Sequence, residues 1–260
     1  MMKTALITGA SSGIGKELAN IHASNGGNLV IVARSEEELN ELKSKLESQH
    51  KVNVHVIVKD LTAPDATQEV YDEIKEAGIE IDYLINNAGF GGIGKFHERD
   101  WSSDQNMILL NVMALTHLCR LFTPDFVNRN SGKILNVSST ASLMPGPMQA
   151  VYFATKAFVR SLSNAISQEL SETNATVTNL MPGATETDFG KTSGMDKTSL
   201  FDQTASAKDV AQAGYDAMLN GDMDIKTGLS FSQKAMLATI PFTPKKVLLK
   251  MVEKMQQPKD

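Results

Sequence analysis

The chain has 260 residues and a formal net charge of −5, with 42% hydrophobic and 21% charged residues, a composition ordinary for a globular protein. The acidic balance argues against a nucleic-acid partner, because phosphate binding depends on clustered Lys and Arg. A single cysteine, Cys119, excludes an internal disulfide framework and a thiolate metal cluster.

The first strand pattern begins at Thr4, which leaves no room before it for a signal peptide. No uninterrupted apolar run reaches the ~18 residues of a membrane span. The sequence therefore predicts a cytoplasmic protein.

A glycine-rich turn follows the first predicted strand, residues 4–8, and leads into a helical pattern. The turn reads Gly9-Ala10-Ser11-Ser12-Gly13-Ile14-Gly15. Strand, glycine turn and helix in this order place backbone N–H groups and a helix N-terminus where a phosphate can bind. The turn is therefore a candidate nucleotide site.

Three motifs compete for these glycines. A Walker A loop is disfavoured, because five residues rather than four separate Gly9 from Gly15 and Lys16 is followed by Glu17. The GxSxG elbow of serine hydrolases needs earlier strands, and only eight residues precede Gly9. The spacing TGxxxGxG supplies the tight turn and close backbone approach of a dinucleotide site. A merely tight turn is the remaining alternative.

The second predicted strand, residues 28–33, indicates which dinucleotide is bound. An NAD site normally carries an acid at the end of this strand, whereas an arginine there accommodates a 2′-phosphate. Ala33 stands where the acid is expected, and Arg34 follows it. NADP is therefore favoured over NAD, with a solvated or Glu-paired Arg34 as the alternative.

The rest of the chain continues the alternation of strands and helices. Further strands are predicted at residues 52–58, 82–86, 132–137, 175–180 and 226–231. Helices are predicted at residues 18–23, 36–48, 64–77, 101–128, 152–171 and 207–219. The alternation predicts one α/β domain over residues 1–260, a doubly wound parallel sheet of about seven strands with helices on both faces.

Two helices carry residues that invite a chemical role. Asn111 lies inside a helix, where Asn is unfavourable, so it is either a satisfied core polar group or a functional one. Tyr152 and Lys156 are spaced to share one helix face. A nearby ammonium stabilises a phenolate and lowers the pKa of the tyrosine, which makes the pair a candidate acid/base.

These pieces together resemble the short-chain dehydrogenase/reductase family over residues 3–189, and most closely its bacterial branch, whose substrates are often unassigned. The shared features are TGxxxGxG, the sequence NNAG at residues 86–89, Asn111, Ser139 thirteen residues before Tyr152, and Pro182-Gly183 followed by Thr187. The resemblance implies a Rossmann-type fold and hydride transfer between a nicotinamide cofactor and a carbonyl or alcohol.

The resemblance also implies a role for each catalytic residue. Tyr152 would protonate the carbonyl oxygen, or act as the base in reverse, and Lys156 would lower its pKa and bind the nicotinamide ribose. Ser139 would hold the substrate oxygen, and Asn111 would anchor a water that links Lys156 to solvent. No metal is required, and the five histidines form no ligand pattern.

Cofactor contacts are implied along the whole chain. The phosphates would meet Gly9, Ser11, Ser12, Gly13, Ile14 and Gly15, and the 2′-phosphate would meet Arg34. The adenosine would meet Asp60, Leu61, Asn87, Ala88 and Gly89, and the nicotinamide end would meet Tyr152, Lys156, Pro182, Gly183 and Thr187. Ser12 departs from relatives that carry a second basic residue there, so Arg34 alone would hold the 2′-phosphate.

The substrate would lie between the segment 140–149 and a lid at about 184–206. These carry apolar side chains, namely Leu143, Met144, Met148, Phe189, Met195, Leu200 and Phe201. They predict a small-molecule, partly apolar carbonyl or alcohol substrate.

The tail, about residues 232–260, shows an amphipathic helical stripe that we expect to pack on the body or at a subunit interface, with a membrane-surface contact as the alternative. The family commonly assembles through its two long helices, which predicts a homo-oligomer. The competing function is an NADP-binding regulatory or scaffold protein without turnover, and a serine hydrolase ranks third.

Overall fold

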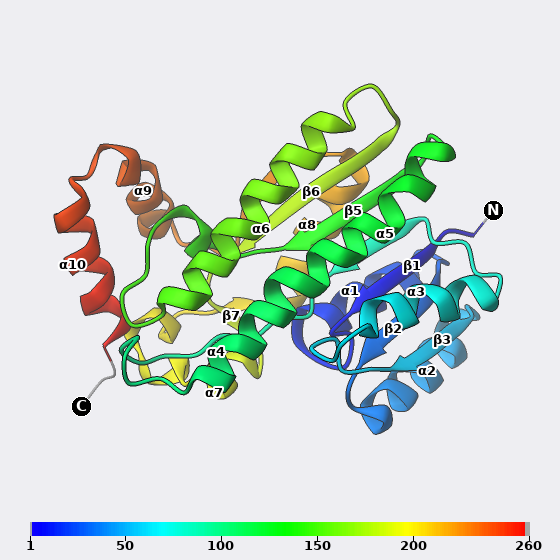
Figure 1. Cartoon of the computed structure of the whole chain (residues 1–260), viewed down its shortest axis with the longest axis horizontal. Helices are drawn as coiled ribbons and strands as arrows, with labels where there is room; N and C mark the ends of the chain where they lie inside the picture. The colour runs from blue at the N-terminus through cyan, green and yellow to red at the C-terminus, as the bar shows by residue number, and fades with distance from the viewer. Residues whose placement is uncertain (1, 258–260) are drawn as a thin grey trace.

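The computed structural model describes residues 2–257, except for the side chain of Leu200, and is built on a seven-stranded parallel sheet (Figure 1). Its strands are β1 (Thr4–Thr8), β2 (Asn28–Ala33), β3 (Val54–Val58), β4 (Tyr83–Asn86), β5 (Gly132–Val137), β6 (Ala175–Pro182) and β9 (Asp224–Thr227). Their order across the sheet is β3-β2-β1-β4-β5-β6-β9. The direction of winding reverses between β1 and β4, where such sheets open a ligand crevice.

Helices cover both faces of the sheet, because alternate residues of each buried strand point to opposite sides. Ala5 and Ile7 of β1 join one buried cluster, and Leu6 joins the other. The first cluster is covered by α1 (Gly13–Ser24), α2 (Glu36–His50) and α8 (Ala207–Asn220). The second is covered by α3 (Ala66–Glu76), α5 (Leu115–Asn128) and α6 (Ala150–Glu169). The predicted doubly wound, Rossmann-type sheet is confirmed.

One long helix on the second face contains a π-helical turn. It consists of α4 (Trp101–Ile108), the π-helical η1 (Leu109–Ala114) and α5 (Leu115–Asn128). Within the described residues 2–257, this helix alone is long and apolar enough to cross a membrane by length and composition. The core helix of a globular protein can have the same length and composition, and here Leu115, Leu118 and Phe122 are buried in the second cluster.

The last strand differs from its prediction. It was expected at residues 226–231, whereas β9 ends at Thr227. Gly228 then adopts a left-handed φ of +68°, and Ser230 caps a new helix, with its hydroxyl accepting a hydrogen bond from the backbone N–H of Gln233. The apolar residues Leu229 and Phe231 thus belong to a turn and a helix start, which explains the wrong boundary.

The tail packs on the body of the protein. It forms α9 (Phe231–Thr239), the short η5 (Ile240–Phe242) and α10 (Lys245–Gln256). Leu248 and Val252 of α10 are buried in a third cluster with Tyr152 and Phe153. The prediction favoured from the sequence was packing on the body or at a subunit interface, and the structure shows the first. Residues 258–260 of the predicted tail lie outside the described residues.

Candidate active site

The glycine turn forms one wall of the crevice between β1 and β4. Gly9 has a φ of +64°, and a Cβ atom there would lie 2.9 Å from the Cα atom of Ala88. The helix α1 starts directly after Ser12, whose side chain makes no capping hydrogen bond, and its first turn carries no acidic residue. The first N–H groups of α1 therefore have no side-chain acceptor there and fit an anionic group such as a phosphate.

Hydrogen bonds tie this turn to the loop that follows β4. The Asn87 side chain donates to the carbonyl oxygens of Thr8 and Gly9, at 3.0 and 3.1 Å. The Thr8 hydroxyl accepts hydrogen bonds from the backbone N–H groups of Asn87 and Ala88, both at 3.0 Å. The two halves of the sheet are thus held together where the crevice opens.

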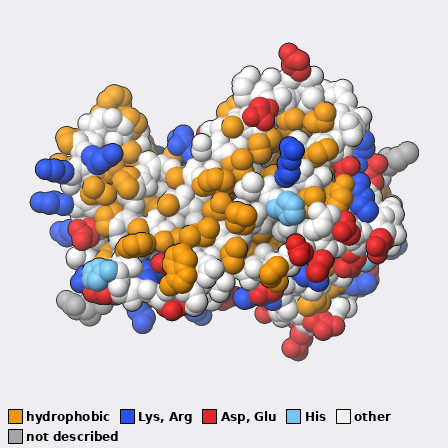
Figure 2. Space-filling model, in the orientation of Figure 1, with side chains coloured by type: hydrophobic (Ala, Val, Ile, Leu, Met, Phe, Trp, Pro, Cys, Tyr) orange, Lys and Arg blue, Asp and Glu red, His pale blue; other side chains and the backbone are white. Residues whose placement is uncertain are grey.

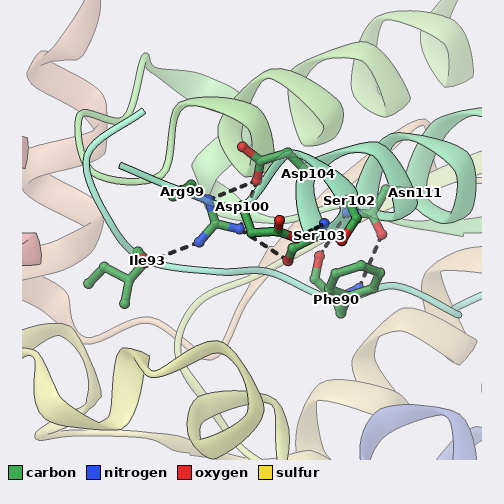
Figure 3. Close-up of polar contacts among 8 residues, drawn as sticks. All are labelled: Phe90, Ile93, Arg99, Asp100, Ser102, Ser103, Asp104 and Asn111. Atoms are coloured by element: carbon green, nitrogen blue, oxygen red, sulfur yellow. Dashed lines mark hydrogen bonds and ion pairs between the residues drawn. The ribbon is translucent and has the colours of Figure 1, made fainter. Parts of the chain in front are cut away.

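Asn111 holds the next part of that loop from the π-helical turn η1 (Figure 3). Its side chain accepts from the backbone N–H of Phe90 at 3.1 Å and donates to the Phe90 carbonyl oxygen at 2.9 Å. It also donates to the Thr155 hydroxyl at 3.2 Å. The side-chain amide therefore positions the loop beside α6, and the water-anchoring role implied by the resemblance stays a prediction.

A buried ion pair holds the far end of the same loop (Figure 3). Arg99 donates from Nε to the Asp104 carboxylate at 2.8 Å and from Nη1 to the Ile93 carbonyl oxygen at 3.0 Å. The side chains of Arg99 and Asp104 are only 12% and 5% exposed. The sequence analysis missed this pair, because nothing in the pattern ERDWSSD shows which charges become buried.

The proposed catalytic residues meet at the carboxyl end of β5. Ser139 follows β5, and its Oγ accepts from the backbone N–H of Ala141 at 3.1 Å. Tyr152 lies in the first turn of α6 and is 6% exposed, with the Ser139 hydroxyl close enough to influence its pKa. The ring of Tyr152 packs against Phe189, with 5.5 Å between the ring centroids. The two hydroxyls are therefore side by side.

Lys156 lies one turn further along α6 and is also buried. Its Nζ donates to the Val137 carbonyl oxygen at 2.9 Å and lies 5.9 Å from the centroid of the Tyr152 ring. Burial lowers the pKa of Lys156 to about 8. Burial raises the pKa of Tyr152 to about 12, against a smaller lowering by the Ser139 hydrogen bond.

The pKa of Tyr152 is raised in this arrangement, whereas the sequence predicted a lowered one. The ammonium points to a backbone carbonyl oxygen, and loss of hydration outweighs any charge effect on the phenol. Tyr152 consequently keeps its proton at neutral pH, as a proton donor must.

One cavity of about 830 Å³ joins the glycine turn to the catalytic residues. It is lined by almost every residue that was predicted to be catalytic or to bind the cofactor, namely Gly9, Ser11, Ser12, Gly13, Ile14, Arg34, Asp60, Leu61, Asn87, Ala88, Gly89, Ser139, Tyr152, Lys156, Pro182, Gly183 and Thr187. Gly15 and Asn111 are the exceptions. Both are buried behind the wall, Gly15 against Gly9 and Asn111 against Phe90.

The end of the cavity near Arg34 carries several charges. Ser35, Glu38 and Lys59 line it as well, none of which the sequence analysis named. The pKa of Asp60 is lowered, mainly by the backbone N–H of Thr62 and in lesser part by the Arg34 charge. Arg34 thus lies close to Asp60 at the end of β2, where the sequence predicted it.

The opposite end of the cavity has walls from three segments. The segment 140–149 contributes Met144 but neither Leu143 nor Met148, which corrects the expected wall. The lid segment folds as β7 (Thr185–Glu186), α7 (Phe189–Ser193), η3 (Met195–Lys197), η4 (Ser199–Phe201) and β8 (Ala205–Ser206). It contributes Phe189, Met195 and Phe201, as expected, whereas the side chain of Leu200, the fourth predicted residue, lies outside the described part of the chain.

The third segment is the tail, whose part in the cavity the sequence analysis missed. The residues involved are Leu229, Gln233, Met236, Leu237, Val252, Met255 and Gln256. The helical stripe through Val252 and Met255 was visible in the sequence. Periodicity shows that such a face is buried, but not which surface it covers.

Comparison with known proteins identifies the family. The family model for short chain dehydrogenases matches residues 3–198. A human very-long-chain 3-oxoacyl-CoA reductase is 32% identical over 193 residues, which cover 72% of this chain and 61% of that protein. An uncharacterized oxidoreductase of Staphylococcus saprophyticus is 30% identical over 71% of this chain and 79% of its own length. The chain thus spans about three fifths of the 3-oxoacyl-CoA reductase.

Solved structures agree in fold over nearly the whole chain. A short-chain dehydrogenase from Sphingobium yanoikuyae in complex with NADPH is 30% identical, with a TM-score of 0.83 and 98% of both chains covered. A bulky-bulky ketone specific alcohol dehydrogenase from Comamonas testosteroni is 30% identical, with a TM-score of 0.79 and coverage of 93% and 92%. A relative from Burkholderia phymatum in complex with NAD, at 24% identity and a TM-score of 0.84, shows the fold alone.

Given the family model, these relatives and the shared sheet, the chain belongs to the short-chain dehydrogenase family of oxidoreductases.

Proposed function

We propose that this protein transfers a hydride between NADP(H) and a carbonyl or alcohol substrate, with Tyr152 as general acid/base. The observation that carries the proposal is the pair of neighbouring hydroxyls of Ser139, which is half-buried, and Tyr152, which is buried. It lines the same cavity as the uncapped N-terminus of α1. A cavity that joins an anion site to a proton donor suits a dinucleotide and a substrate held end to end.

The chemistry divides between cofactor and protein. When bound, the nicotinamide supplies or accepts the hydride. The Ser139 hydroxyl donates a hydrogen bond to the substrate oxygen and stabilises its developing charge. Tyr152, with a pKa of about 12, donates its proton to that oxygen in the reductive direction. Lys156, behind Tyr152, is placed to stabilise the phenolate that remains.

The preference for NADP rests on the end of β2. Arg34 lines the cavity there, and Ala33 offers no carboxylate to bind a ribose hydroxyl. The Sphingobium yanoikuyae relative in complex with NADPH supports the same choice. Glu38 and Asp60 at the same end oppose it, because they repel a phosphate.

The apolar walls of the opposite end favour a bulky, partly apolar ketone or secondary alcohol. The Comamonas testosteroni relative, described as specific for bulky-bulky ketones, supports this substrate class. The cytoplasmic location, the homo-oligomeric state and the single-domain organisation of residues 1–260 complete the proposal on sequence grounds. A membrane-surface contact of the tail is kept as the alternative to a purely cytoplasmic protein.

The test of the reaction is a panel of ketones and alcohols with the reduced and oxidised forms of both cofactors. Tyr152→Phe should lower kcat by about 10²–10⁴-fold, because it removes the acid without changing the ring. Tyr83→Phe serves as the matched control, since Tyr83 lies outside the cavity. Turnover that Tyr152→Phe leaves unchanged would show that this proposal is wrong.

The cofactor preference has its own test. Arg34→Ala should raise the KM for NADPH at least about 10-fold more than the KM for NADH, since a charge-assisted contact to the phosphate is lost. Arg120→Ala, an exposed arginine on α5, is the control. Equal losses for the two cofactors would exclude the 2′-phosphate role of Arg34.

A further inference from the structure

The cavity extends beyond the Ser139–Tyr152 pair into a chamber closed by the tail. Its walls are apolar side chains, namely Met144, Phe189, Met195, Phe201, Leu229, Met236, Leu237, Val252 and Met255. The backbone of α10 is held against the lid segment, where the Ser199 hydroxyl donates to the Met255 carbonyl oxygen at 3.2 Å. The chamber is therefore suited to a large apolar group.

One wall residue of the chamber has a buried side-chain amide without a hydrogen-bond partner. Gln256, the last residue of α10, lines the cavity and is 0% exposed. Neither its Nε2 nor its Oε1 has a hydrogen-bond partner among the described residues. An unpaired buried amide is costly, so its natural complement is a group that it can hydrogen-bond.

The other glutamine of the chamber has a different environment. Gln233 also lines the cavity, but its Oε1 accepts from the backbone N–H of Ser230 at 2.8 Å and completes the cap of α9. Its Oε1 is thus already engaged by the protein. Gln256 differs from it because both atoms of its amide are buried and unpaired among the described residues.

The charges around the cavity indicate what that ligand group is. The charged residues that line it are Arg34, Glu38, Lys59, Asp60, Lys156 and Asp188. The first four lie at the Arg34 end, and the last two belong to the Tyr152 region and the segment beside Thr187. No lysine or arginine of the tail lines the described cavity. A carboxylate or phosphate in the chamber would therefore lack a cation, whereas a neutral group would not.

We infer that Gln256 selects substrates whose bulky apolar substituent carries a neutral hydrogen-bonding group, such as a hydroxyl, oxo or amide group, at the end remote from the reacting carbonyl. Nε2 donates to an oxygen of this group, and Oε1 accepts from a hydroxyl or N–H. This inference rests on the proposed function, because it takes the reacting carbonyl to lie at Ser139 and Tyr152. The substrate class is thus a bulky apolar ketone or alcohol with a remote neutral polar group, and Gln256 is the residue that binds this group.

A series of phenyl alkyl ketones tests the inference, with alkyl chains from about four to about ten carbons so that one length spans the chamber. Each length is made with a terminal methyl, hydroxyl or carboxylate group. We expect the wild-type protein to prefer the hydroxyl over the methyl by at least about 10-fold in kcat/KM at one length. Gln256→Leu should remove that preference, and the carboxylate should be disfavoured in both proteins.

Gln257→Leu is the matched control, because Gln257 is exposed and lies outside the cavity. Calorimetric binding of the same ketones to protein saturated with NADP⁺, which cannot reduce a ketone, gives a readout that does not require turnover. Gln256→Leu should keep or raise the melting temperature, since it removes an unpaired buried amide. If Gln256→Leu lowers the melting temperature and leaves the substrate selectivity unchanged, Gln256 stabilises the fold and does not bind the substrate, and the inference is wrong.

The outcomes separate the two proposals. If methyl-terminated ketones are reduced by the wild type and lost in Tyr152→Phe, the proposed function holds. The inference is then wrong if the ratio of kcat/KM for the hydroxyl- and methyl-terminated ketones is equal in wild type and Gln256→Leu at every length. The Gln256 amide would in that case bind only a buried water. Failure of every ketone in the series to bind also overturns it.

Discussion

Tyr152 and Lys156 are both held in environments that favour their neutral forms. The phenol is protonated at neutral pH in any case, so its raised pKa carries no penalty there. The lysine is different, because its pKa falls from 10.5 to about 8 and it is charged at pH 7 while buried. The site therefore contains a charge that the fold would be more stable without, as active sites often do.

Lys156→Met should stabilise the protein at pH 7. Below pH 8 the folded state bears the full cost of the charge, about 3 kcal/mol at 1.36 kcal/mol per pKa unit. Loss of the hydrogen bond to Val137 offsets about 1 kcal/mol of this, so the expected net stabilisation is about 2 kcal/mol. Between pH 8 and 10.5 the unfolded chain binds more protons than the folded one, so wild-type stability rises with pH and the gain disappears.

Urea unfolding at pH 7 and at about pH 10 measures this difference. Lys45→Met, at an exposed position of α2, is the control and should change stability little at either pH. A gain of equal size at both pH values would contradict the assigned cause. Lys156→Met should also lose turnover, so this substitution would raise stability and lower activity.

At the scale of residues, the sequence predicted best where the chemistry is local. The glycine turn and the Tyr152–Lys156 spacing are fixed by neighbours along the chain. The direction of the Tyr152 pKa shift was predicted wrongly, because it depends on burial by Phe153 and Phe189 and on where Lys156 points. Gln256 was not selected, since an unpaired amide is defined by what surrounds it in space.

At the scale of elements, the loop between β4 and α4 is held at two points by the long helix. Asn111 of η1 holds Phe90, and Arg99 with Asp104 of α4 holds Ile93 (Figure 3). Between these points Gly91 lies against the active site, where an added Cβ atom would be 3.2 Å from the Tyr152 ring and 2.8 Å from the Phe189 ring. The loop is therefore a wall of the substrate site whose position depends on α4.

Asp104→Asn should destabilise the protein by about 2–4 kcal/mol, because it leaves the guanidinium of Arg99 buried without a counter-charge. Displacement of the loop should raise the substrate KM while the pH profile set by Tyr152 stays unchanged. Thermal unfolding and steady-state kinetics measure the two effects.

The double variant Arg99→Met with Asp104→Leu is the matched comparison. It replaces both charges by apolar side chains and should recover most of the lost stability. If it is less stable than Asp104→Asn alone, the cost lies in lost packing and not in an unpaired charge.

Strand and helix identities were predictable because buried parallel strands are continuous apolar runs and the helices are amphipathic. The π-helical turn at η1 was not, since nothing in Leu109–Ala114 departs from a helical pattern except Asn111. The end of β9 was misplaced because Leu229 and Phe231 extend its apolar run past Gly228. Hydrophobicity alone therefore does not predict an element boundary that is set by the conformation of a turn.

At the scale of the whole molecule, the outer side of the helices on the second face is unusually apolar. Figure 2 shows hydrophobic side chains gathered over the front face, where Figure 1 places α4 and α6. Exposed members from these helices and η1 are Trp101, Ile108, Met113 and Phe158. A second copy packed on this face would cover these exposed side chains.

Met113→Glu and Phe158→Glu should each shift the protein to monomer, because a buried carboxylate in such an interface is costly. Size-exclusion chromatography with light scattering measures the mass. Phe242→Glu, at an equally apolar and more exposed position in η5, should leave the assembly unchanged. A wild-type monomer, or equal effects of all three variants, would place the interface elsewhere.

The position of the tail also has a genetic consequence. The family model ends at residue 198, and the sheet is complete at Thr227, yet much of the chamber wall is encoded by the contiguous stretch after that residue. A single recombination event near Gly228 could therefore exchange that wall between relatives while leaving the sheet, the glycine turn and the acid/base pair intact. New substrate ranges could arise in one such step, without the many separate substitutions that a wall scattered along the gene would require.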